Sequence, residues 1–481
     1  MLQNKNTTIV SEVKDFFTSS EKAINTILTI LSSLTLSEKQ NGLLSRSNNE
    51  FTNINKLLLV LMFPFFEVKD AWHFSKSSLY PIMSCGKDIF YRLLNDSTIS
   101  WRKISYKLSI QMICKTRSKS SEIEGKQTRC LIIDDTDLPK TGRQIEFIGK
   151  VFSHVTSQSI LAFKGLFMGY HDGKSFFALD FSLHGEKGKN EKKPFGLTKK
   201  QLKDRFSKRR DKNSEGIKRK KEYFTTKIQS MIEMIKTAII NGVRFDYVLV
   251  DSWFTCFELV NFIKKRRIGC HLLGMAKMGK TRYSLNDKML TAKEIIDLQR
   301  RKKKVKHSKL LCCYYSEVLV DFKGIQVKLF FSKASRKGRW YLLLSTDLEL
   351  NFEQAYKIYS TRWSIEVFFK ESKQYLGLGK CQSQDFDAQI ASTTASMIQY
   401  NLLSVAKRFT DYESLGELFR NTKAETIQLT VAEHIWQIIV EILASLAELF
   451  EIDTELLMEN LISDNEKLIK LSKYITLLQA G

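Results

Sequence analysis

The strongest constraint on the fold comes from three short apolar runs, each of which is followed by or ends in a polar side chain. They are CLIIDD at 130–135, YVLV before Asp251, and WYLLLS at 340–345. Runs this short and this continuously apolar are typical of strands buried on both faces of a sheet. Stretches with helical spacing of apolar residues lie between and after them, at 223–241 and 352–375. The chain is therefore predicted to be an α/β protein.

The length of 481 residues allows about three domains at roughly 100 to 200 residues each. Hydrophobic residues make up 43% of the chain, which permits a large core and excludes a disordered or low-complexity protein. The sequence pattern divides the chain into a helical region at 1–125, an α/β region at 126–274, a β-rich insertion at 275–338, a second α/β region at 339–410, and a helical region at 411–481.

The net charge predicts a polyanionic partner. The chain has 76 Lys and Arg against 52 Asp and Glu, a formal charge of +24, and nucleic acid is the common partner of so basic a protein. The longest apolar stretch, Leu57 to Phe66, is too short to span a bilayer. The first residues lack the layout of a secretion signal, so the protein is expected to stay inside its cell, without a membrane partner.

The charges are unevenly distributed. Residues 187–221 hold 16 basic and 4 acidic residues, and further basic clusters lie at 264–267 and 300–309. Each cluster alone is usually solvated surface, but together they suit the backbone of a long DNA duplex. Residues 411–481 hold 13 acidic and 5 basic residues with an apolar helical stripe from Ile435 to Phe450, which favours a protein contact over DNA.

The cysteines and histidines give no support for a zinc site. None of the eight cysteines forms a CxxC pair, and no HExxH occurs among the seven histidines. Zinc sites depend on such spacings because a few closely spaced ligands must reach one ion. The thiols are predicted to be reduced and mostly buried.

The helix expected at 352–375 carries the most informative polar residues. Tyr359, Arg362, Glu366 and Lys373 are separated by three, four and seven residues, which places them within a sector of roughly 60° on one helix face. The plainer interpretation is a solvated stripe with an ion pair between Arg362 and Glu366. Apolar neighbours such as Phe368 indicate that the helix is partly buried, so the polar stripe is expected to face a specific partner.

These four residues form the pattern Y-x2-R-x3-E-x6-K, present here as YSTRWSIEVFFKESK. In this pattern the chain resembles the DDE transposases of bacterial insertion sequences, in particular insertion sequence family four. That family has an RNase H-like core with an Asp on its first strand, an Asp at the end of its fourth strand, and a Glu on a late helix. This sequence offers Asp135 in IIDDT, Asp251 in VLVDSW and then Glu366, with an insertion before the Glu.

The resemblance implies that Asp135, Asp251 and Glu366 are the catalytic residues and the metal ligands. Carboxylates hold hard Mg²⁺ ions, and two such ions can activate a water and stabilise the leaving 3′ oxygen of a phosphodiester. The implied cofactor is therefore a pair of Mg²⁺ ions, with Mn²⁺ as a substitute. Taken alone, an Asp at a strand end is more often a cap or a turn residue.

Asp134, Asp135 and Asp137 compete for the first of these positions. Alternation along a strand puts Asp134 and Asp135 on opposite faces of the sheet. The family pattern of an Asp followed by a Thr favours Asp135, because Thr136 follows it. We therefore assign the first position to Asp135 from the sequence.

The resemblance also assigns DNA contacts. Tyr359, Arg362 and Lys373 are implied to hold phosphates at the transposon end, in keeping with the way Arg and Lys bind phosphate. Trp340 occupies the place of a base-stacking Trp in the family, although core packing is nearly as good an interpretation. Trp253 and Trp363, which apolar residues flank, are predicted to lie in the core.

Two alternatives stay open from the sequence. The segment GMAKMGKT at 274–281 matches the P-loop pattern GxxxxGK[ST], which favours an ATPase, but the residues after it do not open a long amphipathic helix. The second alternative is a non-catalytic or domesticated DNA-binding relative that has kept the basic surface. The presence of all three acids argues against it.

By resemblance, the chain is expected to be a cut-and-paste transposase that works through a hairpin intermediate. Region 1–125 is then expected to bind double-stranded DNA at the terminal inverted repeats. Regions 126–274 and 339–410 form the RNase H-like core, which also engages target DNA. Region 411–481 helps to pair two protomers into a homodimer on DNA. The expected location is the bacterial cytoplasm, in association with the nucleoid.

Overall fold

The computed structural model describes residues 23–45, 52–66, 68, 70–76, 86–118, 127–265, 268–410 and 412–424. The chain divides into two compact units. One comprises Met1–Thr29, Met62–Asp88 and Tyr412–Gly481, and the other comprises Ile30–Leu61 and Ile89–Asp411. The second unit contains the whole sheet and all the site residues that the sequence predicts.

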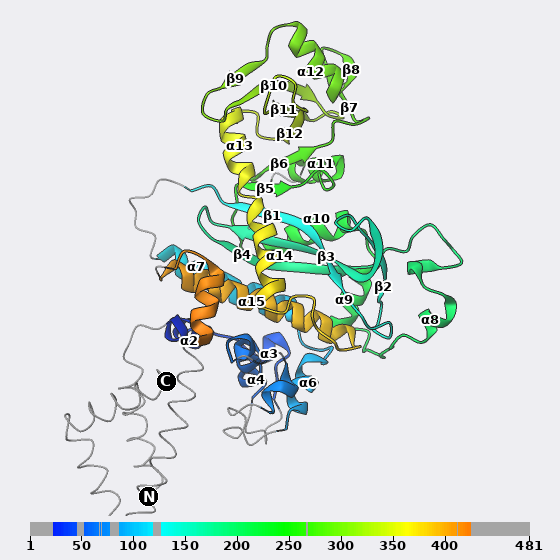
Figure 1. The fold of residues 1–481 in the computed structure, drawn as a ribbon, viewed down its shortest axis with the longest axis vertical. Helices are drawn as coiled ribbons and strands as arrows, with labels where there is room; N and C mark the ends of the chain where they lie inside the picture. Colours follow the sequence, from blue (N-terminus) through cyan, green and yellow to red (C-terminus); the bar gives the residue numbers. More distant parts are fainter. Residues whose placement is uncertain are drawn as a thin grey trace, which may run out of the picture. The chain divides into compact units, whose positions relative to one another are not determined.

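The described strands form one 12-stranded mixed sheet (Figure 1). Strands β3, β1, β5, β6 and β12 are neighbours in that order, and β4 pairs with β3. Strands β1, β5 and β6 are parallel, whereas β3 and β12 run antiparallel to their neighbours in this group. The strands are β1 Cys130–Pro139, β2 Gly149–Ser153, β3 Gln158–His171, β4 Phe176–His184, β5 Tyr247–Val250, β6 His271–Ala276, β7 Arg282–Leu285, β8 Lys288–Thr291, β9 Lys306–Ser308, β10 Cys313–Asp321, β11 Gln326–Lys333 and β12 Tyr341–Ser345.

The three apolar runs of the sequence form β1, β5 and β12 at the centre of the sheet. All four residues of β5 are buried, as are the first four of β1. Burial on both faces explains why these strands read as continuous apolar runs. In the parallel pairing of β1 with β5, Ile133 lies opposite Val250. The residues that follow this pair, Asp134 within β1 and Asp251 directly after β5, therefore lie at the same level along the two strands.

The predicted insertion continues the same sheet. Strand β11 pairs with β12, and β10 pairs with β11, β9 and β7. A helix, α12 Ala292–Arg301, lies among these strands, so the segment is not composed of strands alone. Strand β12 then pairs with β6 and returns the chain to the core.

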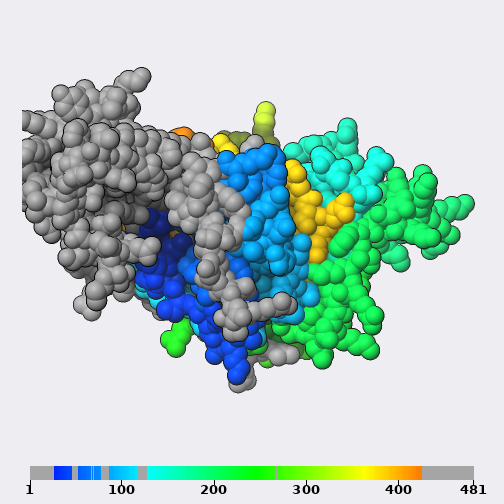
Figure 2. Space-filling view, turned by 90° about the horizontal axis from the view of Figure 1, so that it is seen from below, coloured from blue at the N-terminus to red at the C-terminus, as the bar shows by residue number. Residues whose placement is uncertain are grey.

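Several helices of the second unit pack on the sheet. Besides α12, the helices of the described residues are α2 Ala23–Ser32, α3 Glu38–Asn41, α4 Asn53–Met62, η1 Phe63–Phe66, α5 Ala71–Phe74, α6 Asp88–Leu94, α7 Trp101–Ser118, η3 Pro194–Gly196, α8 Lys199–Lys203, α9 Glu215–Tyr223, α10 Lys227–Ile240, α11 Phe257–Lys265, α13 Phe352–Ser360, α14 Trp363–Tyr375 and α15 Phe386–Arg408. Helix α14 packs on β1 and β4, and α10 packs on β3 and β4. Figure 2 shows α7 and α15 side by side, and both contact β4. No helix among the described residues is long and apolar enough to cross a membrane.

Aromatic rings pack together in the described part of the first unit. The ring of Phe63 lies 5.1 Å from that of Phe74, and the ring of Phe65 lies 5.8 Å from that of Phe419. The apolar stripe predicted from Ile435 to Phe450 falls outside the described residues, as does most of the predicted region 411–481. Helix α7, although within region 1–125, packs on the sheet of the second unit through hydrogen bonds from Ser105 and Ser109 to β4.

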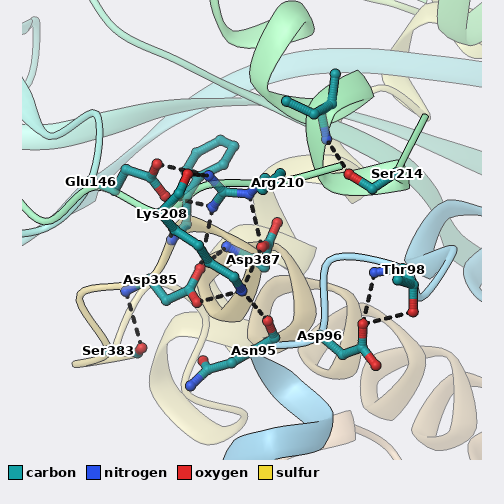
Figure 3. Close-up of polar contacts among 12 residues, drawn as sticks. Asn95, Asp96, Thr98, Glu146, Lys208, Arg210, Ser214, Ser383, Asp385 and Asp387 are labelled. Atoms are coloured by element: carbon teal, nitrogen blue, oxygen red, sulfur yellow. Dashed lines mark hydrogen bonds and ion pairs between the residues drawn. The ribbon is translucent and has the colours of Figure 1, made fainter. Parts of the chain in front are cut away.

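Charged side chains from three separate parts of the chain form ion pairs with one another (Figure 3). They come from the β1–β2 connection, the α8–α9 connection and the start of α15. We call Glu146, Lys208, Arg210, Asp385 and Asp387 the buried ion cluster. The guanidinium of Arg210 donates to Glu146 at 2.5 Å and to Asp387 at 2.9 Å. The ammonium of Lys208 donates to Asp385 at 2.8 Å and to Asp387 at 3.0 Å. Two cations of the basic segment 187–221 thus bind carboxylates inside the protein and are not presented to DNA.

Candidate active site

Two aspartates follow the buried parts of neighbouring parallel strands. Asp134 lies on β1, where its Oδ1 accepts the backbone N–H of Asp135 at 2.8 Å. Asp251 directly follows β5, and its Oδ1 accepts the backbone N–H groups of Trp253 at 2.9 Å and Phe254 at 3.2 Å. These turn contacts fix the orientation of the Asp251 carboxylate. Asp251 therefore occupies a strand-end position of the kind at which α/β sheets commonly build sites, and Asp134 lies beside it within β1, where pairing with β5 stops.

Arg362 joins Asp134 to Glu366. Its guanidinium donates to Oδ2 of Asp134 at 2.7 Å and to Oε1 of Glu366 at 2.5 Å. The second contact spans four residues, one helical turn, as the sequence spacing predicts. The first contact reaches across to the sheet. Through this guanidinium, the acid of α14 and the acid of β1 share one cation.

The environment of Asp134 disfavours its charged form. Burial raises the pKa of Asp134 to about 7, the guanidinium of Arg362 opposes this shift, and the negative charge of Asp251 adds to it. The influence of Asp251 indicates that the two carboxylates are close enough to repel each other. An additional cation beside them would relieve this repulsion.

Asp135 points to the opposite face of the sheet, as strand alternation requires. Its carboxylate forms an ion pair with the ammonium of Lys227, at the start of α10. The same ammonium lies 4.2 Å from the ring centre of Trp253. The structure thus brings Asp134, Asp251 and Glu366 towards one another and gives Asp135 a partner elsewhere, which differs from the assignment made from the sequence.

The remaining signature residues contact the same two strands. The hydroxyl of Tyr359 donates to the carbonyl of Val250 at 3.2 Å, directly before Asp251, and burial raises the pKa of Tyr359 to about 12. The ammonium of Lys373 donates to Oγ1 of Thr136 at 2.7 Å, and burial lowers the pKa of Lys373. Tyr359, Arg362 and Lys373 therefore contact β1 or the end of β5, and Glu366 is linked to β1 through Arg362.

The helix expected at 352–375 is two helices. α13 ends at Ser360 and α14 begins at Trp363. Between them, the N–H of Arg362 donates to Tyr359 at 3.0 Å and that of Ile365 donates to Arg362 at 3.2 Å, so each bond spans three residues instead of four. This tighter turn falls at the signature arginine.

The tryptophans differ from the prediction made for them. Trp253 and Trp363 were expected in the core, but their exposed fractions are 50% and 63%. Apolar neighbours misled the prediction, because Phe254 and Ile365 are the residues that turn inwards while the indoles stay outside. Trp340 is half-buried immediately before β12, with the ammonium of Lys333 at 4.8 Å from its ring centre.

Comparison with known families agrees with this geometry. Residues 77–269 match the family described as "DDE superfamily endonuclease", a range that includes Asp134 and Asp251. Residues 205–388 match the family described as "Archaeal putative transposase ISC1217", a range that includes Asp251 and Glu366. Over these two ranges the chain is similar to DDE superfamily domains. The predicted fold class is confirmed, because the mixed sheet and this match agree with an RNase H-like core.

Solved structures with partial likeness to the chain include two DNA-related proteins. One is a piggyBac transposase in a synaptic complex with hairpin DNA, with 14% identity, a TM-score of 0.42, and coverage of 86% of this chain and 81% of that one. The other is the NurA nuclease from Sulfolobus solfataricus, with 10% identity, a TM-score of 0.23, and coverage of 58% and 86%. TM-scores below 0.5 are too low to establish a shared fold. No curated protein matches the chain.

The three acids of the candidate site have the right donor atoms for a hard divalent ion, but they are not arranged around one in this structure. Asp134, Asp251 and Glu366 supply only carboxylate oxygens, which are the donors that Mg²⁺ prefers. Among the described residues, however, no group of three or more His, Cys, Asp or Glu is arranged to hold a metal ion. The guanidinium of Arg362 contacts Oδ2 of Asp134 and Oε1 of Glu366, so in this arrangement it occupies the place of a cation between two of the three acids.

The structure at 274–281 does not have the strand–loop–helix arrangement of a P-loop. Gly274 lies within β6, paired on one side with β5 and on the other with β12. A Cβ at this position would lie 2.3 Å from Oγ1 of Thr255, which explains the glycine by close packing. Strand β7 begins at Arg282, directly after the motif, so no helix follows to direct its N-terminus at a phosphate.

Sequence reasoning missed one residue of this region. Lys227 gives no signal in the sequence, because it is one cation among many and its contact with Asp135 depends on how α10 crosses the sheet. The assignment of the first acid to Asp135 stays a prediction. The register of β1 against β5, which pairs Ile133 with Val250 and so sets Asp134 beside Asp251, gives no signal in the sequence.

Proposed function

We propose that this chain is a DNA transposase that moves an insertion sequence by cut-and-paste transfer, and that Asp134, Asp251 and Glu366 are its catalytic acids. The single observation that carries the proposal is the placement of these acids around two neighbouring strands: Asp134 and Asp251 follow paired residues of β1 and β5, and Arg362 links Glu366 to Asp134. Asp135, favoured by the family pattern, is the competing candidate for the first acid.

Each residue has a role in this proposal. The three carboxylates would hold two Mg²⁺ ions, or Mn²⁺ in their place, which supply an activated water and charge stabilisation for the leaving 3′ oxygen. Tyr359, Arg362 and Lys373 would bind phosphates near the cut. Arg362 then has two uses, because a DNA phosphate offers its guanidinium an alternative to the carboxylates.

The later steps of the proposal follow the family resemblance. The freed 3′ hydroxyl would attack the opposite strand to form a hairpin, and the reopened end would then join to target DNA. Two protomers would pair the two terminal inverted repeats, and Trp340 would stack on an unpaired base. The chain would act on DNA in the cytoplasm, at the nucleoid.

Cleavage of a plasmid that carries the element and its flanks tests the proposal. With Mg²⁺, the wild-type protein is expected to cut at the element ends, and Asp251→Asn and Glu366→Gln are expected to bind the same DNA without cutting. Thr255→Ser, a conservative change beside Asp251, serves as the control and should cut. Equal cutting by all four proteins would exclude these acids. DNA binding without cutting by the wild type would favour a non-catalytic relative.

A further inference from the structure

A basic cavity lies at the end of β1, away from the acids described above. It has a volume of about 400 Å³, and its walls come from the connection after β1, from β2 and from the segment at 193–201. The volume falls in the range of ligand sites in proteins. All these segments belong to the same compact unit as the candidate active site.

The charges around this cavity are all of one sign. Lys140, Arg143, Lys150 and Lys193 line it, and no acidic residue does. Arg143, Lys150 and Lys193 are exposed, and in the described part of the chain none of their side chains forms an ion pair. Cations that share a cavity repel one another, so a bound anion would stabilise this arrangement.

Lys140 is held more firmly than the other three cations. Its ammonium donates to the carbonyl of Gly379 at 2.8 Å and to that of Cys381 at 2.9 Å. Burial lowers the pKa of Lys140 to about 8. Lys140 thereby connects the cavity to the segment that follows α14, the helix of Glu366 and Lys373.

The cavity lies in line with the acids along one strand. Asp134 and Lys140 are six residues apart, which spans about 20 Å at roughly 3.3 Å per residue. Lys373 contacts Thr136 between them, so cations recur along this path.

We propose that this cavity binds a backbone phosphate of the DNA substrate. The inference rests on the proposed function for the identity of that substrate, and the binding itself is measured without cutting. A free nucleotide or inorganic phosphate shares this chemistry, and the experiment below separates these sources from DNA.

The test compares two triple variants with the same change in charge. In the cavity variant, Arg143→Gln, Lys150→Gln and Lys193→Gln remove three lining cations. In the control variant, Arg282→Gln, Lys288→Gln and Lys293→Gln remove three exposed cations from β7, β8 and α12. Binding to a 40-base-pair duplex of arbitrary sequence is measured by fluorescence anisotropy across salt concentrations, without divalent ions, so that cutting plays no part.

The cavity variant is expected to bind the duplex at least ~10-fold more weakly, with a salt dependence reduced by about one unit or more in log–log slope. The control variant should lose less than ~3-fold. Equal losses in the two variants would overturn the proposal. Calorimetric titration with ATP and with inorganic phosphate completes the test, because binding of either one to the wild type but not to the cavity variant, with unchanged DNA affinity, would also overturn it.

Discussion

Two arginines of this protein are each held between carboxylates, and their surroundings differ. Arg210 of the buried ion cluster has a fully buried side chain and contacts Glu146 and Asp387. Arg362 contacts Asp134 and Glu366, but the Glu366 side chain is 34% exposed. Near Arg210, a second cation, Lys208, shares the acids, whereas Arg362 alone faces two acids with Asp251 beside them.

The difference is the one expected between a structural group of charges and the proposed catalytic one. Buried charges are tolerated when each is paired and hydrogen-bonded, and the buried ion cluster meets this condition. At the candidate site one guanidinium serves three carboxylates, whereas two cations share the three carboxylates of the buried ion cluster, and burial and the charge of Asp251 raise the pKa of Asp134 to about 7. Unsatisfied charge of this kind is typical of sites that bind a cation or substrate.

The largest expected effect is on the cleavage rate, and it distinguishes Asp134 from Asp135 on the opposite face of β1. Asp134→Asn should reduce Mg²⁺-dependent cleavage by at least ~10³-fold, because it removes a carboxylate from the group of three acids. Asp135→Asn should reduce cleavage by only about 10-fold, through the loss of its ion pair with Lys227. Gel assays of plasmid nicking measure both rates. The reverse order of the two variants would return the role to Asp135.

The next effect is on stability. Arg210→Met leaves three buried carboxylates with one cation and should lower the free energy of unfolding by roughly 3–5 kcal/mol. Arg362→Met should lower it by only about 1 kcal/mol, because Glu366 reaches solvent and Asp134 can take up a proton. Urea denaturation of both variants provides the measurement. A larger loss for Arg362→Met would contradict the contrast between the two arginines.

The smallest effect concerns pH in the presence of EDTA. The unfolded carboxyl of Asp134 loses its proton near pH 4, and the folded one loses it at about 7. Its contribution to stability is therefore complete at low pH and is lost as the pH rises through this window. From pH 5 to pH 8, the wild type should lose about 2–3 kcal/mol relative to Asp134→Asn. Parallel pH profiles of the two proteins would disprove the raised pKa.

The central fold and the region of the site could be predicted from the sequence because both depend on local patterns. Four-residue apolar runs identify buried strands, and the spacing of Tyr359, Arg362 and Glu366 indicates one helix face. The choice between Asp134 and Asp135 is different, because it depends on the register of β1 against β5, where a shift by one residue exchanges the faces. The family pattern alone pointed to the neighbouring acid.

Other features depend on packing that no local pattern encodes. Lys208 and Arg210 belong to a segment with the composition of a DNA-binding surface, yet their partners come from positions more than sixty residues away in the chain. Trp253 stays exposed because its neighbour Phe254 fills the core instead. Composition therefore identified the basic character of the segment correctly, but not which of its cations stay free.

The break between α13 and α14 lies between the insertion and the helix that carries Glu366. Phe352 of α13 stacks on Tyr315 of β10 at 4.4 Å, and the same helix contacts β6, so α13 touches both the insertion and the core. Helix α14 is anchored to β1, β4 and α15 instead. Arg362 stands at the joint, where a tilt of the insertion against the core would first alter the guanidinium that holds Asp134 and Glu366 together.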